Sequence, residues 1–111
     1  MKQTVAMKQP HLFRRAYAKG KSAVTPTVVL YARKNGQSFN RLGLTVGTKV
    51  GKAHLRNRVR RRLKDSYRLR EEAVKTGYDL VIVARTAAAE ARFEVLDRHL
   101  ASLLKRLELL A

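Results

Sequence analysis

Apolar residues recur in three stretches of the chain with the period of a helix, in which residues three and four apart share a face. The predicted helices span residues 11–19, residues 53–76, and residues 88 or 91 to 110. Pro10 stands where proline is favoured in a first turn, and Gly20 and Gly77 stand where glycine commonly ends a helix. The pattern therefore predicts three helices.

Strand-like runs separate these helices. The predicted strands are residues 27–33 (TVVLYAR), residues 41–46 (RLGLTV) and residues 78–84 (YDLVIVA). The last run is almost continuously apolar, which is typical of a central strand covered on both faces. Asn35 and Gly36 carry the signal of a turn between antiparallel strands. Residues 21–26 are interpreted as a loop or a short strand, and residues 1–9 are expected to be irregular and mobile.

The same periodicity assigns a core side to the elements. In the helix over residues 53–76, one apolar stripe contains Leu55, Val59, Leu63 and Tyr67. In the first strand, Val29 and Tyr31 share one face, and Val28 and Leu30 share the other. Three helices and a small mixed sheet indicate the α+β class. A chain of 111 residues is expected to form one domain, residues 1–111.

The net charge of the chain indicates which kind of partner it binds. The formal net charge is +17, and residues 52–70 hold nine basic residues against one acid, Asp65. Arg56, Arg60 and Lys64 form one outward row on the predicted helix, and Asn57, Arg61, Lys64 and Arg68 form the next. Like charges at this spacing repel one another, so a bound polyanion would relieve the repulsion. We interpret the helix as a nucleic-acid-binding surface rather than as a solvated face without a partner.

Other classes of function find less support in the sequence. The chain has no cysteine, and its eight acids and three histidines show no spacing typical of a metal or catalytic site. The N-terminus has no apolar segment of the signal-peptide kind, and no run is long enough to cross a membrane, so a cytoplasmic location is expected. Binding to an anionic membrane surface is disfavoured, because no helix pairs its charge with a bulky aromatic face. We expect no catalytic residues, no protein-bound metal and no small-molecule substrate.

The aromatic residues of the first predicted helix allow two interpretations. Phe13 and Tyr17 lie four residues apart on one face. Spacing alone favours a packing role, in which both rings anchor the helix to the sheet. The alternative is that the rings form a platform on which the bases of a single strand stack.

The stretch from Lys49 to Arg68, KVGKAHLRNRVRRRLKDSYR, closely resembles the signature of the bacterial ribonuclease P protein subunit. The FxxxY spacing at Phe13, the two strands VVLYAR and RLGLTV, and the strand YDLVIVAR extend this resemblance over nearly the whole chain. The resemblance implies a small α-β sandwich with a mixed, roughly four-stranded sheet and a left-handed β-α-β crossover through the arginine helix, ribosomal protein S5 domain 2-like. It also implies a protein that binds a catalytic RNA, which removes the 5′ leader from precursor tRNA.

The resemblance assigns roles to individual residues. Those implied to contact the catalytic RNA are Lys49, Lys52, Arg56, Asn57, Arg58, Arg60, Arg61, Lys64 and Arg68. Phe13, Tyr17 and Tyr31 would line a groove for the single-stranded leader, which favours stacking over the packing interpretation. The Mg²⁺ of the reaction would be held mainly by the RNA. The alternatives are a ribosomal or ribosome-assembly RNA-binding protein without a role in cleavage and, less favoured, a DNA architectural protein.

Overall fold

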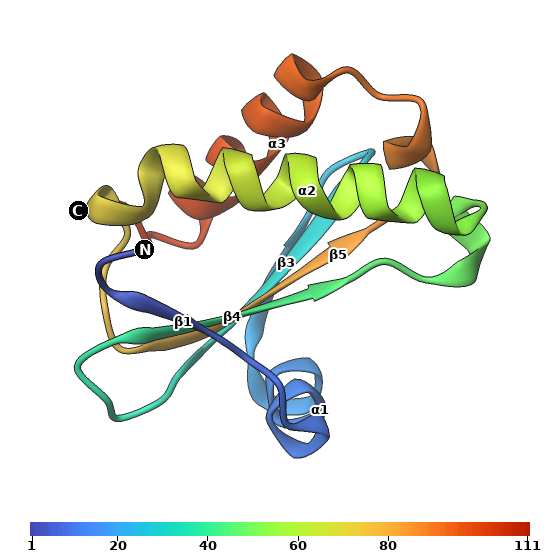
Figure 1. Ribbon diagram of the computed structural model, residues 1–111. Coiled ribbons are helices and arrows are strands. Elements are labelled where there is room, and N and C mark those ends of the chain that lie inside the picture. The colour runs from blue at the N-terminus through green and yellow to red at the C-terminus, as the bar shows by residue number, and fades with distance from the viewer.

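The computed structural model describes all residues from 1 to 111, arranged as one mixed sheet with helices on both faces (Figure 1). The strands are β1 (Thr4–Ala6), β2 (Lys21–Val24), β3 (Val28–Lys34), β4 (Asn40–Thr45) and β5 (Tyr78–Ala84). The helices are α1 (Pro10–Lys19), α2 (Ala53–Arg70) and α3 (Phe93–Arg106), with 3₁₀ turns η1 (Thr48–Val50), η2 (Glu71–Ala73) and η3 (Thr86–Ala89). Helices α2 and α3 cover one face of the sheet, and α1 lies on the other (Figure 1).

The sheet has the strand order β1-β4-β5-β3-β2. Strand β5 lies in the centre, parallel to β4 and antiparallel to β3. Its side chains are buried on both faces, as the apolar run 78–84 predicted: Leu80 and Ile82 belong to the core beneath α2 and α3, and Val81 to a smaller cluster beneath α1. The predicted stripe of α2 is confirmed for Val59, Leu63 and Tyr67, which have no exposed surface, whereas Leu55 is only half-buried.

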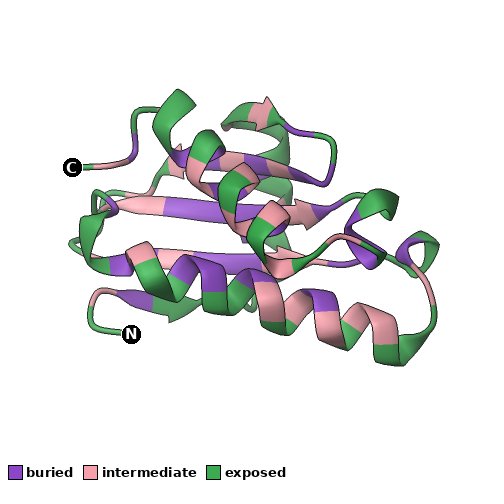
Figure 2. Cartoon of the chain, turned by 90° about the horizontal axis from the view of Figure 1, so that it is seen from above, coloured by how far each residue is buried: buried purple, intermediate pink, exposed green.

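The connection from β4 through α2 to β5 is a left-handed crossover, as the family resemblance implied (Figures 1 and 2). Such crossovers are rare, since right-twisted strands feed a right-handed connection more readily. The unusual hand places α2 on the same face of the sheet as α3. The two helices therefore pack side by side, and the basic side of α2 remains open to solvent (Figure 2).

The sheet has five strands rather than roughly four, because an edge strand forms within residues 1–9, which were expected to be irregular, and another within residues 21–26, which were left open as a loop or a short strand. The expectation that residues 1–9 are irregular is wrong for Thr4–Ala6, which pairs in parallel with β4. A buried carboxylate holds this strand: Glu71 accepts hydrogen bonds from the backbone amides of Lys2 and Gln3 and, at 2.8 Å, from the Thr4 hydroxyl. Residues 21–24 form the other edge strand, β2.

The Asn-Gly signal predicted a turn between antiparallel strands, which is confirmed for the direction of the two strands but wrong for their pairing. Strands β3 and β4 run in opposite directions, but β5 lies between them. The connecting segment crosses the end of β5, where the Asn35 side chain donates to the carboxylate of Asp79 at 3.1 Å. Gly36 does adopt a positive φ of 73°. Gly36 therefore adopts the turn conformation that the signal predicted. Strand β3 nevertheless pairs with β5, which is more apolar than β4.

Two helices end earlier than their periodicity indicated. Helix α2 stops at Arg70 instead of continuing to residue 76, because Glu71 turns inward to hold β1 and Val74 forms an antiparallel bridge with Leu110. Helix α3 stops at Arg106 instead of residue 110. The chain then folds back through Glu108, which has a φ of 58°, and the Leu109 carbonyl accepts a 2.7 Å hydrogen bond from the Lys75 amide.

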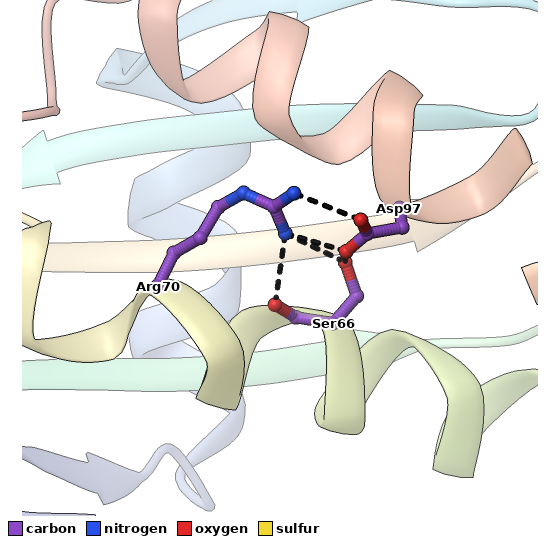
Figure 3. A network of polar contacts seen from close by, with 3 residues as sticks. All are labelled: Ser66, Arg70 and Asp97. Carbon is purple, nitrogen blue, oxygen red and sulfur yellow. Dashed lines mark hydrogen bonds and ion pairs between the residues drawn. The ribbon is translucent and has the colours of Figure 1, made fainter. Parts of the chain in front are cut away.

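A polar network fastens α2 to α3 (Figure 3). The Arg70 guanidinium binds both carboxylate oxygens of Asp97, with Nη2 donating to Oδ2 at 2.8 Å, and the buried Ser66 hydroxyl donates to Oδ1 at 2.7 Å. The hydrogen bonds from Arg70 hold the pKa of Asp97 below its usual value, although partial burial works against them. Bidentate pairs of this kind fix geometry as well as adding energy.

Candidate nucleic-acid interface

The exposed side of α2 presents most of the predicted RNA-binding residues. The exposed members are Lys49, Lys52, Asn57, Arg61, Lys64 and Arg68. The half-buried members are Arg56, Arg58 and Arg60. Only one ion pair lies within this set, between Arg68 and Asp65 at 3.5 Å, and both of its side chains are at least half exposed. The structure therefore brings these residues together as one basic face that its own acids leave largely uncompensated.

Arg58 has a partner within the fold. Its Nη2 donates a 2.9 Å hydrogen bond to the carbonyl oxygen of Ala89 in η3, and Arg62 makes the equivalent bond to Ala91 at 3.0 Å. These two arginines lie one helical turn apart and anchor the segment that leads into α3. Sequence reasoning treated Arg58 only as an RNA contact, since the periodicity of α2 did not reveal which arginines lie above η3.

Asn57 also has a role that the sequence did not specify. Its side-chain oxygen accepts a 3.0 Å hydrogen bond from Nη1 of Arg60, three residues further along α2. Residues at this spacing are neighbours on a helix surface. The amide thus restrains one guanidinium of the basic face, and its own NH₂ group points to no partner in the chain.

The start of α2 adds a positive end to this face. No side chain caps the helix at Lys52, and its first turn holds no acid. Gly51 has a φ of 148°, and a Cβ there would lie 2.9 Å from the Leu55 side chain, so glycine is required where η1 turns into α2. Helix N-termini carry free N–H groups and favour anions. Lys49 and Lys52 therefore flank a helix end suited to a phosphate group.

The three predicted aromatic residues meet on the opposite face of the sheet. Tyr17 and Tyr31 pack edge to face with ring centroids 5.0 Å apart, and the Tyr17 hydroxyl lies 2.7 Å from the hydroxyl of Thr45. Phe13 is half-buried against Gly43, where a Cβ would lie 2.5 Å from the phenyl ring. We call Phe13, Tyr17 and Tyr31 the aromatic surface. Tyr17 is its most accessible ring, with 41% of its surface exposed.

The aromatic surface and the basic face approach each other where β4 ends. Thr45 contacts Tyr17 and also lines a pocket of about 620 Å³ that includes Lys49 of η1. Arg85, directly after β5, lines the same pocket, and its Nη1 donates to the Thr25 carbonyl at 3.0 Å. Sequence reasoning did not select Arg85. The arginine that closes YDLVIVAR was the available signal, but only the parallel pairing of β4 and β5 brings it beside Lys49.

The carboxylates of this chain do not fit a Mg²⁺ site. Asp79 is bound to Arg41 at 3.0 Å and to Asn35, and Asp97 is bound to Arg70 and Ser66. Glu71 accepts hydrogen bonds from the amides of Lys2 and Gln3 and from the Thr4 hydroxyl, and no three acidic or histidine side chains gather in one place. Mg²⁺ prefers several oxygen ligands in octahedral geometry, which these paired groups do not offer.

None of the helices has the length and apolar character needed to span a membrane.

Comparison with known proteins gives one consistent result. A family model described as Ribonuclease P matches residues 1–108. The ribonuclease P protein component of Alkaliphilus oremlandii is 43% identical over 98 residues, covering 88% of this chain and 86% of the relative. That of Clostridioides difficile is 41% identical over 107 residues, covering 96% and 94%.

Solved structures agree with the sequence relatives. The RNase P protein of Staphylococcus aureus superposes with a TM-score of 0.88 at 26% identity, covering 96% of this chain and 97% of the other. The RNase P protein of Thermotoga maritima gives a TM-score of 0.77 at 32% identity, covering 85% and 89%. The α+β arrangement of sheet and helices is thus shared with these proteins over nearly their whole length.

Proposed function

We propose a separate RNA-binding role for each of the two surfaces of this chain, which belongs to the ribonuclease P protein family, the protein subunits of a ribonucleoprotein endoribonuclease. The basic face of α2 binds the catalytic RNA subunit. The aromatic surface holds the single-stranded 5′ leader of precursor tRNA. The RNA performs the hydrolysis that gives the mature tRNA 5′ end.

The observation that carries this proposal is the arrangement of free charge on α2. Six of the nine predicted RNA-binding residues are exposed, and the single ion pair among them is solvent-exposed. Neutralising RNA phosphates releases counterions and relieves the repulsion between these side chains. A structured RNA offers phosphates at a spacing that rows of cations along one helix can follow.

The aromatic surface supplies a different kind of contact. Phe13 and Tyr31 pack in the cluster beneath α1, and Tyr17 packs against Tyr31. Helix α1 lies on the face of the sheet opposite α2 (Figure 1). Stacking on a ring is worth about 1–3 kcal/mol per base and tolerates any base. A leader bound there would be recognised as a single strand rather than by its sequence. This property suits a protein that must accept many precursor tRNAs.

The proposal assigns no chemistry to the side chains of this protein. The paired state of Asp79, Asp97 and Glu71 supports an arrangement in which the RNA subunit mainly holds the Mg²⁺ of the reaction. The protein strengthens binding of the RNA and the leader, and it acts in the cytoplasm, where tRNA precursors are made in bacteria. The family match favours this function over a ribosomal or ribosome-assembly role.

Reconstitution tests the proposal. The full chain is combined with a bacterial ribonuclease P RNA at low Mg²⁺ concentration, and cleavage of a precursor tRNA is compared with that by the RNA alone. We expect the protein to increase the rate, and we expect an Arg61→Gln, Lys64→Gln variant to do so less well. A variant with Arg92→Gln and Arg98→Gln removes two exposed charges, one directly before α3 and one within it, and serves as the matched control.

Two results would contradict the proposal. The first is tight binding of ribosomal RNA without any gain in precursor cleavage, which would favour the ribosomal alternative. The second is cleavage of precursor tRNA by the protein after all RNA has been removed, which would show that the protein carries the chemistry.

A further inference from the structure

A second basic site lies at the end of the sheet away from the start of α2. Strands β4 and β5 are parallel, and α2 follows the end of β4, so the first residue of β5, Tyr78, marks the opposite end. There a pocket of about 500 Å³ is lined by the cationic residues Lys19, Lys21, Arg33, Lys34 and Lys75, with Glu108 as its one acid. We call it the β3-end pocket. None of its cations belongs to the residues implied to bind RNA.

The cations of the β3-end pocket have no partners in the chain. Lys19, Lys21, Lys34 and Lys75 are exposed, and Arg33 is half-buried. The four ion pairs of the protein lie elsewhere, and Glu108 forms none. Five positive charges around one pocket repel one another unless an anion is present. Tyr78, half-buried in its lining, adds an aromatic ring to the site.

The fold builds this pocket from segments far apart in sequence. Strand β2 begins at Lys21, opposite Ala32, so β3 continues past its neighbour for two residues, Arg33 and Lys34. The fold-back after α3 supplies another wall, held by the 2.7 Å hydrogen bond from the Lys75 amide to the Leu109 carbonyl. The cations are thus placed by three backbone features: the short edge strand, the end of α1 and the C-terminal fold-back.

The β3-end pocket begins where the aromatic surface ends and wraps around the end of the sheet, because Ala32, Lys34 and Tyr78 in its lining lie on the face covered by α3. Side chains two residues apart on a strand share a face and lie about 7 Å apart. Tyr31, which belongs to the aromatic surface, is therefore followed on the same face of β3 by Arg33, which lines the pocket. Helix α1 repeats this order, because it carries Tyr17 and ends at Lys19. A single strand leaving the stacked rings in this direction meets Arg33 and Lys19 next, and it reaches Lys34 by passing around the end of the sheet.

We propose that the β3-end pocket binds backbone phosphates of leader nucleotides that extend beyond the aromatic surface. This inference rests on the proposed function, because it names a further contact for the same leader. Phosphate contacts carry no base specificity, so a distal site of this kind lengthens the bound segment without narrowing the range of precursors. Longer leaders gain affinity from it, and leaders that end on the aromatic surface do not.

Binding of two precursor tRNAs to the reconstituted holoenzyme tests the inference. They differ only in leader length: one leader ends within the aromatic surface, and the other is several times longer. The pocket variant is Lys34→Gln with Lys75→Gln, two exposed residues without ion pairs whose replacement leaves the core intact. The control with Arg92→Gln and Arg98→Gln removes the same charge elsewhere.

In the wild-type holoenzyme we expect the longer leader to bind more tightly, and we expect the pocket variant to reduce that advantage roughly five- to ten-fold. The salt dependence of long-leader binding should also become shallower, by about 0.7 in slope for each lost contact to a single strand. The control should keep both the advantage and the slope. Photo-crosslinking from a thiolated distal leader nucleotide should label peptides around Lys34 or Lys75.

The outcomes separate this inference from the function on which it rests. Equal weakening of both precursors would overturn it and would instead indicate a contact to the catalytic RNA or to the tRNA body, with the proposed function intact. An unchanged length advantage in the pocket variant would also overturn it. If the pocket variant bound inorganic phosphate more weakly than wild type but kept the full advantage of the longer leader, the pocket would be an anion site that does not bind the leader, and the inference would be overturned. A wild-type protein that fails to stimulate cleavage would overturn both proposals.

Discussion

The guanidinium of Arg58 donates a 2.9 Å hydrogen bond to the carbonyl oxygen of Ala89, so an arginine of the basic face also holds the segment that leads into α3. Arg61, three residues further along α2, is exposed, and its side chain forms no hydrogen bond or ion pair in the structure. Replacing Arg58 should therefore lower the stability of the fold, whereas replacing Arg61 should not. The difference allows RNA binding to be separated from folding.

We predict that Arg58→Ala lowers the free energy of unfolding by about 1–2 kcal/mol, because a charged hydrogen bond to a partly buried carbonyl is lost. Arg61→Ala should change it by less than about 0.5 kcal/mol. Urea denaturation measures both values. Equal stability of the two variants would contradict the anchoring role of Arg58.

RNA binding, unlike stability, should be weakened in both variants. We expect Arg61→Ala to weaken binding of the catalytic RNA and to reduce the slope of log K against log salt by about 0.9, the value for one phosphate contact. Arg58→Ala should also weaken binding and lower the slope, since only Nη2 of its guanidinium is bonded to Ala89. Titrations at several salt concentrations give the slopes, and an unchanged slope for Arg61→Ala would remove that residue from the interface.

Tyr17 permits a test of stacking against hydrogen bonding. Tyr17→Ala should weaken binding of precursor tRNA by about 1–3 kcal/mol whatever the leader sequence, because one stacking platform is lost. Tyr17→Phe keeps the ring and removes only the 2.7 Å contact with Thr45, so it should retain most of the affinity. Binding of precursors with different leaders to the holoenzyme provides the measurement. A loss as large in Tyr17→Phe would show that the hydroxyl matters more than the ring.

Gly43 in β4 leaves the space that the Phe13 ring of the aromatic surface occupies. A Cβ at this position would lie 2.5 Å from the Phe13 ring and 3.3 Å from the Met7 sulfur. We predict that Gly43→Ala costs about 1–3 kcal/mol of stability through overpacking and also weakens leader binding by displacing Phe13. Gly47→Ala is the control, since its Cβ would meet nothing within 4 Å. Normal leader binding by a folded Gly43→Ala variant would argue against a role for Phe13.

The pair formed by Arg70 and Asp97 should make stability depend on pH. Because the Arg70 hydrogen bonds lower the pKa of Asp97, its contribution is fully present above the unfolded-state pKa of about 3.9 and is lost as the pH falls through the lower folded-state pKa. Asp97→Asn should therefore be less stable than wild type at neutral pH, by about 1–3 kcal/mol, with a smaller difference in acid.

Thermal unfolding between pH 2 and pH 7 checks this prediction. Asp65→Asn is the matched control, because Asp65 is half exposed and pairs with Arg68 only at 3.5 Å. Exposed pairs of this kind contribute little to stability. Parallel stability curves for wild type and Asp97→Asn across this range would contradict the assignment.

The sequence by itself determined the three helices, the three long strands, the α+β class and the family of this protein. Periodicity located α2 and its buried stripe of Val59, Leu63 and Tyr67, because a helix returns to the same face at each turn. The apolar run 78–84 identified the central strand, and the arginine motif identified the family. These features are local, so neighbouring residues in the chain suffice to encode them.

The tertiary structure alone decided which elements become neighbours. It inserted β5 between β3 and β4, ended α2 where Glu71 turns inward to bind β1, and set Arg58 above Ala89. It also gathered Lys19, Lys34 and Lys75 from three separate segments around one pocket. Contacts of this kind join residues far apart in sequence, and their geometry depends on the packing of the whole core. For that reason no spacing along the chain could reveal them.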